Sequence, residues 1–121
     1  MRAFLFLVFG GASGTLLRFG LSQWFATIKP FPAGTFIANL FGCFVIGFLF
    51  QISEKQGLDR SLQLFWMSGF CGALTTFSTL ILELHLFFRN GAYLQGIIYL
   101  LASLLLGLAL FQIGFWIAAK I

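Results

Sequence analysis

The sequence predicts an all-α membrane protein with four transmembrane helices, the third of them broken, in a single domain over residues 1–121. Of the residues, 60% are hydrophobic and 8% are charged, and the mean hydropathy is +1.03, whereas a soluble domain carries about 25% charged residues. Four apolar stretches are each long enough to span a bilayer, which takes about 20 residues of helix. A membrane β-barrel is not expected, because strict alternation over segments of about ten residues is absent.

The expected helices are the four apolar stretches, which cover residues 3–28, 34–53, 62–88 and 92–119. The breaks between them are short and rich in turn-forming or charged residues, and they cover residues 29–32, 54–60 and 89–91. Short connections make neighbouring helices run antiparallel. The first stretch is interpreted as a retained helix and not as a signal peptide, because no small-residue cleavage site is followed by a soluble domain.

The short loops leave no room for a catalytic or nucleotide-binding domain outside the membrane, so an enzyme is not expected. Cys43 and Cys71 have no cysteine or histidine at ligand spacing, and they are interpreted as small apolar packing residues. The seven Lys and Arg residues are scattered, and no cluster resembles a nucleic-acid-binding patch. These features point to membrane lipid as the surroundings of the chain and give no sign of a nucleic-acid partner.

Basic residues are almost balanced between the two ends of the expected bundle. Arg2, Lys55, Arg60 and Lys120 lie at the end with the termini, Lys29 and Arg89 lie at the other end, and Arg18 lies inside the first helix nearer that other end. Because Lys and Arg beside helix ends set orientation, this weak bias predicts either a slight preference for cytoplasmic termini or insertion in both orientations. Insertion in both orientations would permit antiparallel dimers.

Small residues recur at the spacing of helix contacts, namely Gly10 and Gly14, Gly69 and Ala73, and Ser103 and Gly107. Such spacing lets helix backbones approach closely in lipid. Part of it must serve packing within the chain. A four-helix chain of 13.5 kDa has little interior in which to enclose a polar pathway, so a homodimer, or a heterodimer with a similar chain, is expected.

Polar residues are concentrated in the middle of the third apolar stretch, where residues 69–79 read Gly-Phe-Cys-Gly-Ala-Leu-Thr-Thr-Phe-Ser-Thr. Gly72 favours a local break, and non-helical backbone at membrane depth is tolerated only where protein or a water-filled cavity satisfies it. On a helix Thr76, Thr79 and Glu83 would share one face. A single Ser or Thr commonly bonds only the carbonyl one turn back, but this cluster beside Gly72 indicates that something polar is handled there.

Further polar residues lie inside the apolar stretches. Asn39 offers two N–H donors suited to an anion, or else an interhelical hydrogen bond. Thr35, one turn earlier, extends the same face or caps the start of the helix. Arg18 reaches either a water-filled vestibule or the lipid headgroups. A proton relay through Glu83 and His85 is not favoured, because the two side chains project from nearly opposite faces of a helix.

Phe77 differs from the many other phenylalanines by its position among hydroxyl groups. An aromatic ring has a positively charged edge, so a phenylalanine presented edge-on beside Thr76 and Ser78 can attract a small anion. The segment therefore leads to the hypothesis of an anion pathway through the third helix.

Three segments of the chain match motifs of a known family. They are Gly-Gly-Ala-Ser-Gly-Thr-Leu-Leu-Arg at residues 10–18, Gly-Thr-Phe-Ile-Ala-Asn-Leu-Phe-Gly at residues 34–42, and the segment 69–79 given above. On these motifs the chain resembles the Fluc fluoride channels, also called the CrcB family, over essentially its full length. The resemblance implies an antiparallel, dual-topology homodimer with two pores in the inner (plasma) membrane of the cell, which conducts F− passively outward and reduces fluoride toxicity.

The resemblance also implies roles for individual residues. Asn39 corresponds to the family asparagine that faces the permeation path, and Phe77 to the first of two phenylalanines whose ring edges contact fluoride. Gly72 and Thr75 correspond to residues whose backbone carbonyls, from both subunits, hold a central structural Na+ at the helix break, as suits a hard cation that prefers oxygen ligands. The full expected fluoride pathway comprises Asn39, Phe77, Ser103, Thr35, Thr76, Thr79 and Glu83, with Arg18 at a vestibule.

Two positions depart from the pattern of the family. Leu80 stands where a second phenylalanine is common, and Gly107 stands where a second hydroxyl of the fourth helix is often found. The ring-edge pair is therefore incomplete, which allows an altered conductance or a pore completed partly by another protein.

Two other functions are compatible with a small four-helix chain. The first is a dual-topology, proton-coupled drug or metabolite transporter, which uses a membrane carboxylate; that class expects its glutamate in the first helix, whereas Glu83 lies in the third. The second is a non-conducting membrane protein that stabilises other proteins, which the deep Thr and Asn residues argue against.

Overall fold

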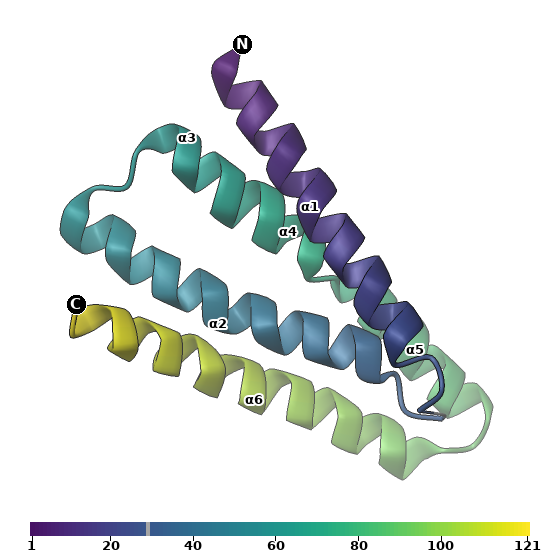
Figure 1. The fold of residues 1–121 in the computed structure, drawn as a ribbon. Coiled ribbons are helices and arrows are strands. Elements are labelled where there is room, and N and C mark those ends of the chain that lie inside the picture. The colour runs from purple at the N-terminus through teal and green to yellow at the C-terminus, as the bar shows by residue number, and fades with distance from the viewer. Residues whose placement is uncertain (29) are drawn as a thin grey trace.

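The computed structural model describes residues 1–28 and 30–121, and the elements found in these residues are all helical (Figure 1). Lys29, counted above among the basic residues of one end, lies outside the described residues. Four helical spans are long and apolar enough to cross a membrane: Arg2–Trp24, Ala33–Gln56, Arg60–Arg89 and Tyr93–Ala119. The predicted all-α class with four membrane-length helices, one of them bent, is confirmed.

The first two spans differ slightly from the predicted ranges. α1 (Arg2–Trp24) ends before residue 28, because the following residues form tight turns in which Ala26 N donates to Gln23 O and Ile28 N donates to Phe25 O. α2 (Ala33–Gln56) extends beyond the predicted range at both ends. Gly57 terminates α2 with a left-handed φ of 68°, a conformation that glycine adopts without steric cost.

The third span consists of four helical pieces. α3 (Arg60–Gln63) continues into η1 (Leu64–Cys71), which is a π-helix, and then into α4 (Gly72–Leu74). After two extended residues the span resumes as α5 (Phe77–Arg89). π-helical turns are rare in proteins, and those that exist are often found at functional sites. The fourth span is the uninterrupted helix α6 (Tyr93–Ala119).

In Figure 1, α2 and α6 lie side by side, and α1 crosses the third span near α4. The α2–α6 contact is close because Gly47 and Gly114 leave room for the partner backbone. A Cβ at Gly47 would collide with the carbonyl oxygen of Phe111, and a Cβ at Gly114 with that of Phe44. Between α5 and α6 lies a small apolar core that consists of Leu80, Leu84, Phe87 and Tyr99.

The contact of α1 with η1 also depends on glycine. A Cβ at Gly10 would collide with the carbonyl oxygen of Phe65, and a Cβ at Gly14 with that of Phe70. A Cβ at Gly69, on the η1 side, would lie 2.8 Å from the carbonyl oxygen of Leu7. The predicted contact pair Gly10 and Gly14 therefore serves packing within the chain, where close backbone approach stabilises helix pairs in lipid.

This packing predicts a strong difference between two neighbouring glycines of α1. Gly14→Ala places a methyl group against the η1 backbone, which cannot move aside as a side chain could, and overpacking of this kind costs about 1–3 kcal/mol. Gly11→Ala is the matched control, because nothing lies within 4 Å of a Cβ there. Thermal unfolding of the purified protein in detergent should show a lower midpoint for Gly14→Ala only; equal midpoints for the two variants would contradict the close contact.

Candidate functional site

The third span is interrupted at two consecutive threonines. Thr75 has φ −83° and ψ 149°, and Thr76 has φ −148° and ψ 115°, both in the extended region. β-branched residues such as threonine favour this conformation. Gly72, where the sequence suggested the break, is itself helical, with φ −63° and ψ −33°. The break therefore lies just after Leu74, at residues 75–76.

The break releases backbone carbonyls that a continuous helix would use. In such a helix the carbonyl of Gly72 accepts from Thr76 N–H, and that of Thr75 accepts from Thr79 N–H. Here Thr76 N donates to Asn39 Oδ1 over 2.7 Å, and Thr79 N donates to Thr76 Oγ1 over 3.3 Å. Both donors are thus engaged elsewhere, so the carbonyls of Gly72 and Thr75 are left without these helical partners.

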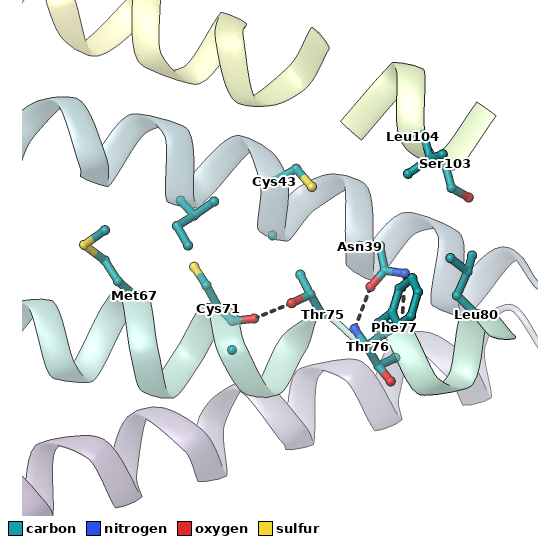
Figure 2. A pocket seen from close by; sticks show the side chains of 13 residues that line it. Asn39, Cys43, Met67, Cys71, Thr75, Thr76, Phe77, Leu80, Ser103 and Leu104 are labelled. Carbon is teal, nitrogen blue, oxygen red and sulfur yellow. Dashed lines mark hydrogen bonds between the residues drawn. The ribbon is translucent and has the colours of Figure 1, made fainter. Parts of the chain in front are cut away.

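Asn39 holds the extended segment from α2. Its Oδ1 accepts from Thr76 N, and its Nδ2 donates to the carbonyl oxygen of Thr76 over 3.4 Å (Figure 2). An amide nitrogen carries two N–H groups, so the second remains for another acceptor. Asn39 is half-buried and lines a cavity, which places this spare donor where a small anion could reach it.

The cavity beside the break has a volume of about 330 Å³. In Figure 2, Asn39, Thr76 and Phe77 gather at one end of it, with Met67 toward the other. Phe77 is 72% exposed, and Gly72 is exposed on the same face. The complete lining is Asn39, Gly42, Cys43, Ile46, Met67, Cys71, Gly72, Thr75, Thr76, Phe77, Leu80, Ser103 and Leu104.

A second polar cluster lies on the α5 side of the break. Thr35 Oγ1 donates to Glu83 Oε1 over 2.6 Å, and Tyr99 OH donates to Glu83 Oε2 over 2.7 Å. Thr35 therefore does not cap α2, which begins after Pro32. Thr35 and Glu83 line a cavity of about 380 Å³ together with Thr79. Both oxygens of the carboxylate thus accept short hydrogen bonds at membrane depth.

Tyr99 is the member of this cluster that the sequence analysis missed. Its side chain is 1% exposed, and its hydroxyl group needs a partner there, because a buried tyrosine usually bonds through its OH. The position of Tyr99 well inside the fourth apolar stretch is the feature of the sequence that could have pointed to a polar role. No pattern in the sequence, however, paired Tyr99 with Glu83.

Two threonine hydroxyls lie between the two clusters, and Thr79 lines the same cavity as Glu83. Thr76 Oγ1 donates to Thr79 Oγ1 over 3.0 Å, so the predicted proximity of these residues is present, although Thr76 is the cap of α5 and not a helical residue. Ser103 lines the first cavity and donates to the carbonyl oxygen of Tyr99 over 2.7 Å. Polar groups consequently form a series from Asn39 past the break to Glu83.

The remaining predicted positions lie around this series. Arg18 reaches the break from α1 and donates to the carbonyl oxygen of Ala73. Leu80, at the departure from the phenylalanine pattern, is 4% exposed and belongs to the α5–α6 core. A Cβ at Gly107 would lie 3.3 Å from Cys43 Sγ, so this position is close to α2. His85 is exposed, apart from the Glu83 cluster.

The family model described as "CrcB-like protein, Camphor Resistance (CrcB)" matches residues 5–115. This chain belongs to the CrcB family. Similar curated proteins are each named "Fluoride-specific ion channel FluC". The relative from Desulfotalea psychrophila is 46% identical over 112 residues, which cover 92% of this chain and 88% of the relative. The relative from Gloeobacter violaceus is 42% identical over 124 residues, which cover 99% and 98%.

A third relative, from Oceanobacillus iheyensis, is 37% identical and covers 94% of this chain and 89% of its own length. CrcB membership together with four candidate spans makes this chain a multi-pass membrane protein. The similarity extends over nearly the whole of each relative. The family-model match over residues 5–115 spans the whole of the third span, Arg60–Arg89.

Proposed function

We propose that this chain is the subunit of a fluoride-specific ion channel, which lets F− leave the cell passively and so lowers fluoride toxicity. The observation that carries this function is the near full-length similarity to relatives that bear that name. A channel needs no chemical step, and the chain is accordingly not an enzyme. The geometry of the break adds a physical basis for the anion pathway.

Fluoride enters a narrow pore only where protein groups replace its water shell. Amide and hydroxyl groups donate hydrogen bonds to an anion, and aromatic ring edges carry partial positive charge. The spare N–H of Asn39 and the ring of Phe77 meet at one cavity beside Thr76. The hydroxyl of Thr76 would turn its proton from Thr79 Oγ1 to the anion, and Ser103 completes the polar part of the wall. The carboxylate of Glu83, bonded by Thr35 and Tyr99, aligns the hydroxyls on the way past Thr79.

Ion flux from proteoliposomes tests this function. Vesicles that contain the purified protein and a fluoride gradient should release F− rapidly once the membrane potential is clamped by an ionophore. The same vesicles loaded with chloride should release Cl− no faster than vesicles without protein. Equal rates for the two anions would contradict the proposed selectivity. Fluoride release no faster than from vesicles without protein would contradict the channel function itself.

The pore is completed by a second copy in antiparallel orientation. Polar groups at membrane depth are costly in lipid, yet Ser78 is exposed, and so is Phe77, which lines the cavity beside Thr76. A covering protein surface removes that cost. The nearly balanced basic residues at the two ends are compatible with insertion in both orientations, which permits an antiparallel homodimer. Two pores in that dimer are what the resemblance to the CrcB family implies.

A structural Na+ fits between the two copies of the break. The carbonyls of Gly72 and Thr75 lack their helical donors, because Thr76 N and Thr79 N bond elsewhere, and oxygen atoms are the ligands that a hard cation takes. Gly72 is exposed, so its carbonyl can approach a symmetry-related copy. When bound, the ion would tie the two breaks together by charge.

Substitution of Gly72 tests the interface separately from the fold. A Cβ there would lie 3.9 Å from its nearest neighbour, the carbonyl oxygen of Met67, so Gly72→Ala is harmless to a single chain. At a close interface it should shift the protein from dimer toward monomer, by about tenfold in the dissociation constant. Gly20→Ala, where nothing lies within 4 Å of a Cβ, is the control.

The oligomeric state is measured by light scattering in detergent across a dilution series. Single-molecule photobleaching in vesicles measures it in the membrane. The interface proposal fails if Gly72→Ala and Gly20→Ala dimerise as tightly as the parent protein. It also fails if the parent protein remains monomeric at every concentration at which it transports fluoride.

The transporter alternative is not favoured by the site. A proton-coupled carboxylate must exchange its proton and its cargo, whereas both oxygens of Glu83 accept hydrogen bonds from Thr35 and Tyr99. The relatives are named as channels and not as transporters. The non-conducting alternative gains no support either, because the polar series borders open cavities instead of sealed contacts.

A further inference from the structure

Arg18 is the basic residue that lies well inside the first span. Its Nε donates to the carbonyl oxygen of Ala73 over 3.0 Å. The side chain is half-buried and runs to the break of the third span. This contact sets it apart from an arginine that only extends toward lipid headgroups.

The carbonyl of Ala73 is one of the groups that the break leaves without its helical donor. In a continuous helix it would accept from Phe77 N–H, but Thr75 and Thr76 are extended between α4 and Phe77, the first residue of α5. An unpaired carbonyl at membrane depth costs several kcal/mol. The guanidinium therefore supplies a donor that the interrupted helix cannot supply.

The position of Arg18 on α1 places its side chain on the face that packs against the third span. Gly10, Gly14 and Arg18 follow one another at a spacing of four residues, so they share a face of the helix. The two glycines seat α1 against η1, and a Cβ at Gly14 would lie 3.1 Å from Leu74 N. The α1 backbone thus passes next to the last residue of α4, one turn before Arg18.

We infer that Arg18 is a positioning residue for the break. Its Nε occupies the carbonyl of Ala73 and holds α4, while the carbonyls of Gly72, one residue before, and Thr75, two residues after, remain available to a cation. Asn39 of α2 holds Thr76, the second extended residue of the break, so α1 and α2 hold the interruption from both sides. The effect on fluoride conduction rests on the proposed channel function, whereas the effect on the break does not.

The alternative role is a positive charge that attracts anions at a vestibule, and three substitutions separate the two. In glutamine, Nε2 follows the same number of carbon atoms as Nε of arginine, so Arg18→Gln keeps a donor at the right place and removes the charge. Arg18→Lys keeps the charge but puts a methylene group at the position of Nε. Arg18→Met places a methyl group at the position of Nε and removes both donor and charge.

Amide hydrogen exchange over residues 72–80 of the full-length protein in detergent reports on the break without any fluoride. We expect exchange in Arg18→Met to be about tenfold faster than in the parent, as for the loss of one hydrogen bond, and exchange in Arg18→Gln to stay within about threefold. Arg18→Lys should lie between them. If exchange is unchanged in all three variants, Arg18 does not position the break.

Fluoride flux at low and high fluoride concentration gives the second readout. A positioning role predicts that Arg18→Gln conducts better than Arg18→Lys, and that raising the fluoride concentration does not restore Arg18→Met. A purely electrostatic role predicts the reverse order and recovery at high fluoride. Should Arg18→Met fail to fold, the order of the Gln and Lys variants alone decides. Absence of flux in the parent would refute the channel and leave the exchange result to decide the positioning role.

Discussion

Asn39→Ala should lower fluoride flux by about thirtyfold, since it removes two hydrogen bonds of roughly 1 kcal/mol each and 1.4 kcal/mol corresponds to a factor of about ten. The loss has two physical parts. Thr76 N and Thr76 O lose the partner that holds the extended segment, and the cavity loses an amide donor for the anion. Fluoride flux from proteoliposomes, normalised to the amount of folded protein, measures the two losses together.

Asn39→Asp distinguishes the two parts. A carboxylate keeps the acceptor for Thr76 N, which is the shorter of the two contacts at 2.7 Å, but it loses the donor to the carbonyl oxygen of Thr76, so the break should be weakened and not lost. It has no N–H for an anion, and its charge repels one. If Asn39 only joins helices, Asn39→Asp should lose only what one hydrogen bond of roughly 1 kcal/mol supports, about fivefold in flux. A loss no greater than that would contradict the anion role of the amide.

Phe77→Ile should reduce fluoride flux by about tenfold while leaving the stability of the protein almost unchanged. The ring is 72% exposed, so its replacement creates no cavity in the core, and an aliphatic side chain of similar bulk still suits a membrane interior. What disappears is the positive ring edge at the pathway, and aromatic edge contacts contribute roughly 0.5–1.5 kcal/mol. Flux and thermal midpoint are measured on the same preparation.

Phe4→Ile is the control for a general effect of exposed phenylalanines. Phe4 is 68% exposed, at the start of α1, and does not line the cavity beside the break. Its replacement should leave the flux within about twofold of the parent, since lone exposed apolar residues carry little specific energy. Equal losses for both variants, or no loss for Phe77→Ile, would show that the edge of the Phe77 ring contributes nothing to conduction.

The architecture could be predicted from the sequence because hydropathy reports directly on what crosses a membrane. The number and order of the helices follow from apolar length, and the loops follow from proline, glycine and charge. The family could also be predicted, since the motifs at residues 10–18, 34–42 and 69–79 are specific, and the matching family model and relatives confirm it. These features depend on local sequence alone.

The details of the site depend on contacts between distant residues, which local patterns do not contain. Glycine suggested a break at Gly72, but the extended residues are Thr75 and Thr76, because Asn39 supplies partners for Thr76 there. The pairing of Tyr99 with Glu83 could not be predicted, because a tyrosine in an apolar helix has several possible partners. The anion pathway, the Na+ site and the antiparallel dimer stay predictions.

The close seating of η1 on α1 has a consequence for biosynthesis. The third span is the least apolar of the four, and its threonines enter the bilayer from the translocon before any other molecule can shield them. Gly10 and Gly14 on the already inserted first helix give that span a place to dock within its own chain. Each newly made polypeptide can therefore pack its own spans together in the lipid, and the proposed pairing would be a later encounter between finished molecules.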